Sequence, residues 1–332
     1  MCKRRLAVWV SLSTLSLFVL VELGLRFTLG LGTPPLLQAD STIGYLHQAN
    51  QDIMRFGNRV RINGFHQRSD PLSTQPDSSV LRVLFLGDSV TWGGVLIDQA
   101  NTYPEVFKVR AESACAMPVE ALSASAGSWG IGNLKAYLDR FGTFDSDIVV
   151  LQIGSHDLLQ ETSDSSPVEN HPSFPTENPW LATQELVTRY LWPRYVRPLL
   201  ASSAPDSTAL DSSVQVMRFD RNMNALSNMV HAIRVAGAQP LLLHTPNRNE
   251  VVAGTDGQFT SKYTSYRARF LALADSLSTP VINLSQCWRG ANASANFRDS
   301  VHLTVRGNVA VGSLLAQVVK SSGLICSPTP TY

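Results

Sequence analysis

Charged residues are scarce in this chain of 332 residues, and neither sign is in clear excess. They make up 16% of the total, with 27 Lys and Arg against 26 Asp and Glu, so the formal net charge is only +1. Proteins that bind nucleic acid normally present a strongly basic face. The composition therefore predicts no nucleic-acid partner.

Cysteines and nucleotide-binding motifs are few or missing. There are four cysteines, and no Cys/His spacing resembles a zinc site. The glycine-rich turn at residues 87–94 has neither the Gly-x-x-x-x-Gly-Lys-Ser/Thr pattern nor the Gly-x-Gly-x-x-Gly pattern of phosphate-binding loops. We therefore expect no metal and no nucleotide cofactor.

A long apolar run stands near the start of the chain. Basic residues 3–5 precede about 20 mostly apolar residues, 6–25, which at ~1.5 Å each can cross a ~30 Å hydrocarbon layer. We expect residues 1–32 to be a retained signal anchor with a cytoplasmic N-terminus and a periplasmic or extracellular body; cleavage as a signal peptide is the alternative. Glu22 and Arg26, four positions apart, can pair near its outer end.

Residues 33–80 have the composition of a linker followed by a segment that wraps the main domain. Residues 40–61 are polar with little periodicity, which predicts irregular structure. Residues 59–65 alternate and then reach Asn63-Gly64, which predicts an edge strand and a turn.

Short apolar runs alternate with helical patterns over residues 81–325, which we take as the main domain. Strands are predicted at residues 81–87, 118–124, 147–154, 240–244 and 281–284, and helices at residues 102–114, 133–141, 212–236, 261–277 and 304–319. This alternation predicts a parallel sheet covered by helices on both faces.

The stretch 158–211 is too long for an ordinary connection, so we expect an insertion that serves as a lid or substrate wall. Residues 181–200 could form helical turns broken at Pro193 and Pro198. We expect a helix packed on the core; the arginines and aromatic residues also suit a membrane surface, which is the alternative.

The strand predicted at residues 81–87 leads into Asp88 and Ser89. A Ser on the turn between a buried strand and a helix exposes its hydroxyl at the carboxyl edge of the sheet, which is a position for a nucleophile. A turn that only caps the helix, without chemistry, is the alternative.

Turns that follow different strands of a parallel sheet converge on one crevice. Besides Ser89, this brings together Gly127, His156, Asp299 and His302. His302 is the candidate base for Ser89, and Asp299 can orient it. The amides of Ser89 and Gly127 and the side chain of His156 are candidate oxyanion donors.

These residues resemble the four sequence blocks of the SGNH (GDSL-like) hydrolase superfamily, in the same order. The blocks are Gly87-Asp88-Ser89, Gly127, Gly154-Ser155-His156-Asp157 and Asp299-Ser300-Val301-His302. The resemblance covers about residues 83–316. It implies a three-layer α/β/α flavodoxin-like sandwich with a parallel sheet, and hydrolysis or transfer of acyl esters without metal or cofactor.

His156 departs from the family pattern, which has Asn at this position. We expect it to donate a ring N–H as a neutral imidazole; a side chain turned away and held by neighbours such as Asp157 is the alternative. Trp129 and Arg248 are candidate substrate contacts: Trp129 could stack on a sugar face, and Arg248 follows the fourth strand at the same crevice. Core packing of Trp129 and a structural salt bridge of Arg248 are the alternatives.

The resemblance and the anchor together predict a serine esterase or O-acyltransferase acting on acyl, in particular acetyl, esters of a cell-surface or exported polysaccharide. The expected partners are a carbohydrate or other acyl-ester substrate, the membrane, and proteins of a polysaccharide-synthesis complex. The alternative function is a catalytically silent binding or assembly protein of an envelope polysaccharide machinery.

The expected fold also predicts one disulfide. Cys2 lies on the cytoplasmic side, which leaves three exported cysteines. In a flavodoxin-like arrangement the first and last helices lie side by side and run the same way, so Cys115 and Cys326, just past their ends, become neighbours. Cys287 lies at the opposite edge. We therefore predict the pair Cys115–Cys326.

Overall fold

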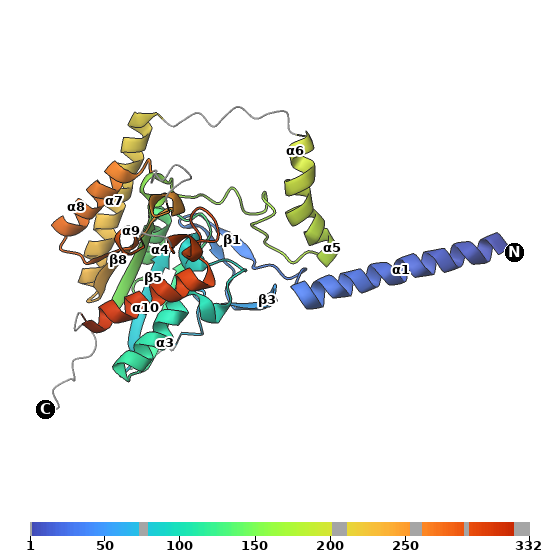
Figure 1. Ribbon diagram of the computed structural model, residues 1–332, viewed down its shortest axis with the longest axis horizontal. Coiled ribbons are helices and arrows are strands. Elements are labelled where there is room, and N and C mark those ends of the chain that lie inside the picture. Colours follow the sequence, from blue (N-terminus) through green and yellow to red (C-terminus); the bar gives the residue numbers. More distant parts are fainter. Residues whose placement is uncertain (1, 73–78, 201–210, 253–260, 289–291, 322–332) are drawn as a thin grey trace.

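A five-stranded parallel sheet organises the part of the chain that the computed structural model describes, residues 2–72, 79–200, 211–252, 261–288 and 292–321 (Figure 1). Its strand order is β6-β5-β7-β8-β9. The strands are β5 (Leu81–Gly87), β6 (Val119–Ser125), β7 (Ile148–Gly154), β8 (Gln239–Thr245) and β9 (Val281–Asn283). All five coincide with predicted strands, because each is a short, mostly apolar run, and β5 and β7 are buried along their whole length.

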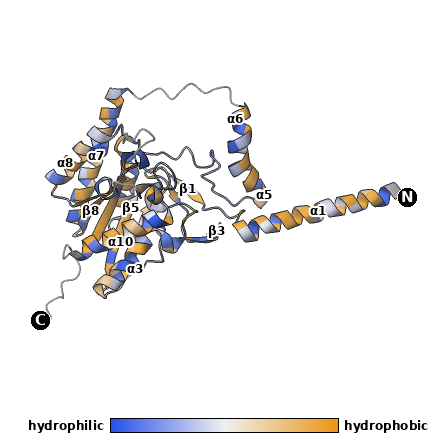
Figure 2. Ribbon diagram, viewed as in Figure 1, coloured by the Kyte–Doolittle hydropathy of each residue, from blue (hydrophilic) through white to orange (hydrophobic). Residues whose placement is uncertain are grey.

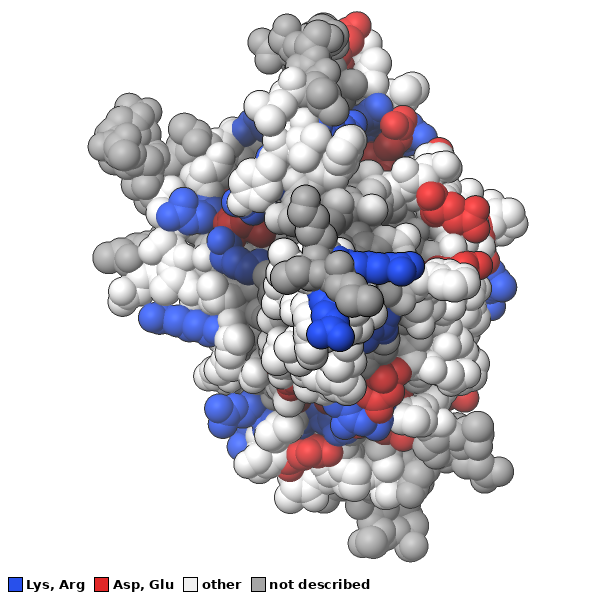
Figure 3. Space-filling model, turned by 90° about the vertical axis from the view of Figure 1, so that its right-hand side faces the viewer, with Lys and Arg blue, Asp and Glu red and all other residues white. Residues whose placement is uncertain are grey.

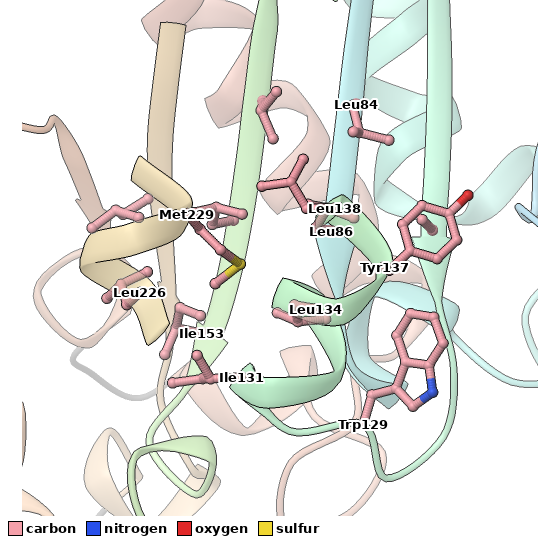
Figure 4. Packing of buried hydrophobic residues seen from close by; sticks show 14 of the residues in the cluster. Leu84, Leu86, Trp129, Ile131, Leu134, Tyr137, Leu138, Ile153, Leu226 and Met229 are labelled. Atoms are coloured by element: carbon pink, nitrogen blue, oxygen red, sulfur yellow. The ribbon is translucent and has the colours of Figure 1, made fainter. Parts of the chain in front are cut away.

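Helices cover both faces of the sheet. One face carries α4 (Ile131–Phe141), α7 (Ser212–Val235) and α8 (Thr264–Ser276), and the other carries α3 (Tyr103–Cys115) and α10 (Val305–Ser321). Alternate residues of β5 point to opposite faces, so Leu84 and Leu86 join the first core (Figure 4) and Val83 and Phe85 join the second. The predicted three-layer fold is confirmed.

The segment before the sheet is more regular than its sequence indicated. It forms two antiparallel hairpins outside the main sheet, β1 (Leu37–Asp40) with β2 (Gly44–His47) and β3 (Gln51–Arg55) with β4 (Asn58–Ile62). The prediction of irregular structure is therefore wrong, and the expected edge strand pairs with β3 instead of the main sheet. Val60 and Ile62 of β4 pack against Trp92, so this hairpin is held by the turn that carries the candidate nucleophile.

Helix α1 (Cys2–Leu29) projects away from the α/β body (Figure 1), and most of its length is apolar (Figure 2). Its stretch Arg4–Leu29 is long and apolar enough to cross a membrane. The predicted pairing near its outer end is confirmed, because Arg26 Nε lies 2.7 Å from Glu22 Oε1.

The insertion contains one continuous helical segment, residues 182–200, that stands apart from the sheet (Figure 1). It consists of α5 (Ala182–Glu185), the π-helical η3 (Leu186–Val196) and α6 (Arg197–Leu200). The predicted breaks at Pro193 and Pro198 are wrong, because helical backbone continues through both: Pro193 lies in η3 and Pro198 in α6. The expected packing on the core is also wrong, since no residue of η3 is buried.

Short helical turns connect the main elements. They are α2 (Ser89–Trp92), η1 (Gln99–Asn101), η2 (Asp157–Leu159), η4 (Arg248–Glu250), α9 (Leu284–Cys287) and η5 (Ala293–Asn296). The first and last long helices of the domain, α3 and α10, pack side by side, as the disulfide prediction requires. Cys326 itself lies outside the described residues.

Candidate active site

The turn between β5 and α2 fixes the position of Ser89. A Cβ on Gly87 would lie 1.9 Å from the hydroxyl oxygen of Thr91, so only glycine fits at the end of the strand. Asp88 caps α2, because its Oδ1 accepts a hydrogen bond from the Val90 amide at 2.7 Å. Ser89 is the first residue of α2, and its side chain is only partly buried.

Ser89, His302 and Asp299 form a continuous hydrogen-bonded chain. The Ser89 hydroxyl donates to His302 Nε2 at 2.9 Å, and His302 Nδ1 donates to Asp299 Oδ2 at 2.8 Å. His302 is 213 residues from Ser89 in the sequence. This arrangement can remove a proton from the serine hydroxyl and stabilise the imidazolium that results.

Asp299 is held in its charged form by its own loop. Partial burial alone would raise the pKa of Asp299, but the backbone N–H groups of His302 and Val301 and the His302 side chain lower it overall. These two amides donate to Asp299 Oδ1 at 2.8 and 3.0 Å, which leaves Oδ2 for the imidazole. The loop therefore orients the carboxylate before any substrate binds.

The glycine turn after β6 lies next to the nucleophile turn. Gly87 and Ser125 are paired in the sheet, so Ser89 and Gly127 each follow by two residues. The hydroxyl of Tyr45 donates to the Gly127 carbonyl at 2.5 Å, which orients this peptide from the β1–β2 hairpin. Burial raises the pKa of Tyr45 to about 12, so it remains a donor at neutral pH.

Trp129 is a core residue, and the expectation that it stacks on a sugar is wrong. It is 2% exposed and packs on the α4 side of the sheet near Leu134 and Tyr137 (Figure 4). Its indole N–H donates to the backbone carbonyl of Tyr45 at 3.0 Å. Both the ring and its one polar group are therefore used internally.

His156 makes an ionic contact instead of standing free as an oxyanion donor. Its Nε2 donates to Asp88 Oδ2 at 2.8 Å and lies 3.5 Å from Asp157 Oδ1, while Nδ1 is buried. Burial alone would lower the pKa of His156, but the carboxylates of Asp157 and Asp88 raise it to about 10. The expected neutral, oxyanion-facing imidazole is thus corrected to an imidazolium held by two acids, close to the alternative stated above.

Asp88, His156 and Asp157 are close enough together to suggest a metal site, since their ligand atoms lie within 4.8 Å. However, the Gly154 amide donates to Asp157 Oδ2 and the Val90 amide to Asp88 Oδ1. Asp88 Oδ2 and Asp157 Oδ1 lie 2.8 and 3.5 Å from His156 Nε2, so in this arrangement the imidazole is the partner of both carboxylates.

A polar hollow of about 490 Å³ adjoins the triad. Arg248 lines it, and the loop that carries Arg248 is bonded to the triad loop through a 2.8 Å hydrogen bond from its amide to the Ser300 carbonyl. The other lining residues are Asn247, Asn249, Ser294, Phe297, Arg298, Asp299 and Ser300. A larger hollow of about 730 Å³, between residues 169–180 and the start of the 182–200 helix, contains no residue of the triad.

Two buried polar residues that support the site were not found from the sequence. Gln152 Oε1 accepts from the Asp88 amide at 3.1 Å and from the Thr91 hydroxyl at 3.0 Å. Arg68, 1% exposed, donates to the carbonyl of Trp92 at the end of α2 and to those of Gly94 and Ile97 in the loop that follows. The only hint at Gln152 was a polar residue within an apolar strand; nothing local marked Arg68.

Comparison with known proteins gives one matching family and several solved structures of low sequence identity. The sequence matches the GDSL-like Lipase/Acylhydrolase family over residues 85–310. No curated protein matches the chain.

Three solved structures illustrate the similarity of fold. The acetyl xylan esterase AlAXEase is 17% identical, with a TM-score of 0.47 over 72% of this chain and 100% of that one. The lipase/acylhydrolase of Enterococcus faecalis is 14% identical (TM-score 0.46, 73% and 96%). A catalytic mutant of an acetylxylan esterase of Geobacillus stearothermophilus is 13% identical (TM-score 0.45, 75% and 96%).

Proposed function

Because the chain belongs to the GDSL-like Lipase/Acylhydrolase family, we propose that it is a serine esterase in which Ser89 is the nucleophile, His302 the base and Asp299 the orienting carboxylate. The observation that carries this proposal is the hydrogen-bonded chain from Ser89 to His302 to Asp299, at 2.9 and 2.8 Å. Three groups from two distant segments have the contacts that a serine nucleophile requires.

The reaction proceeds through an acyl-enzyme. His302 Nε2 takes the Ser89 proton as Oγ attacks the acyl carbonyl, and the tetrahedral intermediate collapses when the leaving alcohol takes that proton back. Water, or a sugar hydroxyl in a transfer reaction, then gives its proton to His302 and attacks the acyl group on Ser89. Collapse of the second intermediate returns the proton to Ser89.

Backbone amides stabilise the oxyanion in this proposal. The N–H groups of Ser89 and Gly127 are on adjacent turns at the ends of paired strands, and in this proposal both donate to the oxyanion. His156 contributes less directly, as a positive charge that compensates Asp88 beside the nucleophile.

The substrate we propose is an acyl ester, in particular an acetyl ester, of a cell-surface or exported polysaccharide. The hollow next to the triad is lined mainly by amide, hydroxyl and guanidinium groups, which suit a hydroxylated substrate better than a long acyl chain. Arg248 and Arg298 would hydrogen-bond to the sugar. The same acyl-enzyme serves hydrolysis or O-acyl transfer.

We also propose that α1 anchors the protein in a membrane and that the α/β body lies on the periplasmic or extracellular side. Basic residues at the N-terminal end of α1 and the apolar stretch Arg4–Leu29 support this orientation. An anchored enzyme of this kind can work beside the proteins of a polysaccharide-synthesis complex.

Hydrolysis of p-nitrophenyl acetate by the full chain in detergent tests the proposed chemistry. Turnover should exceed that of buffer and fall by roughly 10³-fold or more in Ser89→Ala, because the acyl-enzyme cannot form. Ser128→Ala, on the neighbouring turn, is the matched control and should retain activity. If the full chain neither hydrolyses the ester nor reacts with a serine-directed fluorophosphonate, the alternative of a catalytically silent binding protein is supported.

A further inference from the structure

The helical segment of residues 182–200 is tied directly to α1. Glu22 of α1 is 8% exposed and caps the start of the segment, accepting from the Ala182 amide at 2.6 Å and the Thr183 amide at 3.0 Å. Arg26 donates to the Trp180 carbonyl at 2.6 Å. Charged groups at the outer end of α1 thus hold the first turn of the segment.

A buried ion pair ties the same segment to the β3–β4 hairpin. Arg55 is fully buried, and its guanidinium meets Glu185 at 2.6 and 3.0 Å and the Tyr190 hydroxyl at 3.0 Å. Glu185 also accepts from the Gly32 amide at 2.6 Å. Glu185 therefore joins the segment to both the hairpin and the residues just after α1. Separating Arg55 from Glu185 would leave a buried charge without its partner, so this contact is costly to break.

A row of apolar side chains along the segment is exposed. Val187, Leu191, Tyr195 and Leu199 follow one another at intervals of four residues, and they are 48%, 40%, 60% and 84% exposed. Trp192 beside them is 49% exposed. Large side chains gathered in a stripe on an exposed helix mark a surface that binds something apolar.

The charge of the segment suits an anionic surface. The segment contains Arg189, Arg194 and Arg197 and one acidic residue, Glu185, which is paired with Arg55 and Arg189. Arg194 and Arg197 are exposed. Apolar residues, tryptophan and arginine on one helix are the composition of helices that lie in the headgroup region of a bilayer.

The position of the segment relative to α1 matches such a location. If the hydrocarbon layer begins at Leu6, about 20 residues at ~1.5 Å each carry α1 to its other side near Arg26, one turn beyond Glu22. These are the residues that bind the start of the segment. Figure 1 shows the segment running across the direction of α1. Figure 3, which views the molecule from the side on which α1 projects, shows both basic and acidic side chains scattered over this face.

We infer that residues 182–200 form an interfacial helix that lies on the bilayer spanned by α1, with the stripe 187-191-195-199 at the acyl boundary and Arg194 and Arg197 on lipid phosphates. This inference rests on the anchoring part of the proposed function. The bound surface is an anionic phospholipid bilayer. The helix would hold the α/β body at a fixed distance and orientation from the membrane.

Tryptophan quenching tests the inference on the full chain. The protein is placed in nanodiscs of phosphatidylcholine and phosphatidylglycerol, with or without lipids brominated near the headgroup. A Trp9→Phe background removes the tryptophan within α1. In that background, brominated lipid should quench part of the emission, and replacing both Trp180 and Trp192 with Phe should reduce the quenched part by about twofold or more, since interfacial rings lie at that depth.

Control variants separate the possible outcomes. Trp288 follows α9 on the α/β body, so Trp288→Phe should leave the quenched part of the emission unchanged. The double variant Leu191→Glu, Leu199→Glu should lower the quenched part, while hydrolysis of p-nitrophenyl acetate persists. Equal quenching with and without Trp180 and Trp192 would overturn the inference. If Trp9 is quenched in the chain that retains it, α1 is in the bilayer even when the helix 182–200 is not. Ester hydrolysis tests the active site separately.

Discussion

His156 lies where the family pattern has Asn, and its two acidic neighbours make it a cation rather than a neutral donor. Asp88 caps α2, the helix that begins with Ser89, so His156 contacts the nucleophile turn through the Asp88 carboxylate. We therefore expect His156 to affect the stability of this turn more than the reaction barrier. Loss of an oxyanion donor would lower kcat by about 10²- to 10³-fold. We expect substitution of His156 to lower kcat by less than this.

The stability contributed by this cluster should decline as pH rises. The pKa of His156 is raised from 6.5 to about 10, so its contribution is complete below pH 6.5 and is lost as pH rises through about 10. Burial also raises the pKa of Asp157, and the charge of His156 opposes that shift.

Urea unfolding of the wild type and of His156→Asn at pH 6 and pH 10 measures this effect. At pH 6 the wild type should be more stable by about 3 kcal/mol, the cost of leaving a buried charge without its partner. The difference should shrink at pH 10, while kcat of His156→Asn stays within about tenfold of the wild type. A difference independent of pH, or a 10²-fold loss of kcat in a stable variant, would contradict this account.

At the scale of elements, the hairpin region before the sheet supports the nucleophile turn. Arg68 follows β4, and its guanidinium lies 4.8 Å from the Trp92 ring while donating to carbonyls at 2.5 to 2.8 Å. Burial lowers the pKa of Arg68 to about 9, and Asp98 and Glu105 oppose that shift. One side chain thus fixes the loop that follows α2.

Arg68→Met should loosen this loop. Three buried carbonyls lose a charged donor at about 1–3 kcal/mol each, so we expect the free energy of unfolding to fall by about 3 kcal/mol or more and kcat to fall with it. Arg68→Lys should recover only part of the loss, because an ammonium cannot reproduce the planar fork. Thermal unfolding and ester hydrolysis measure both effects, with the exposed Arg59→Lys as control. Unchanged values in Arg68→Met would exclude this supporting role.

For the molecule as a whole, the packing of α3 on α10 bears on the disulfide. Gly312 of α10 allows this contact, since a Cβ there would lie 2.8 Å from the Tyr103 carbonyl and from the Val106 side chain. Cys115 is the last residue of α3. Because α3 and α10 pack side by side, the chain that continues after α10 starts at the end of the domain where Cys115 lies.

We predict that Cys115 and Cys326 form a disulfide in the exported protein. Such a bridge typically stabilises a protein by ~2–4 kcal/mol. Peptide mapping of unreduced protein should recover the two cysteines in one cross-linked peptide pair, and Cys115→Ser should lower the melting temperature. Cys287→Ser is the control, because Cys287 is exposed beyond β9 at the other edge of the sheet. Recovery of Cys287 in the cross-linked pair would refute the pairing.

The sequence by itself determined the layered fold and the order of the candidate triad. Apolar strands such as Leu81–Gly87 and the helical patterns between them are local signals, and parallel strands bring their carboxyl ends to one edge whatever the loops contain. Ser89, Asp299 and His302 could therefore be proposed from their places after strands and before the last helix.

Only the tertiary structure decided which partners the buried polar and aromatic groups have. Glu185 pairs with Arg55 across 130 residues, and Trp129 donates to Tyr45 across 84. His156 meets Asp88 across 68 residues. Such pairs leave no periodic pattern in the sequence, because each polar side chain could equally be exposed to solvent or bonded to another residue. Burial makes the difference, since a desolvated polar group must find its partner within the fold.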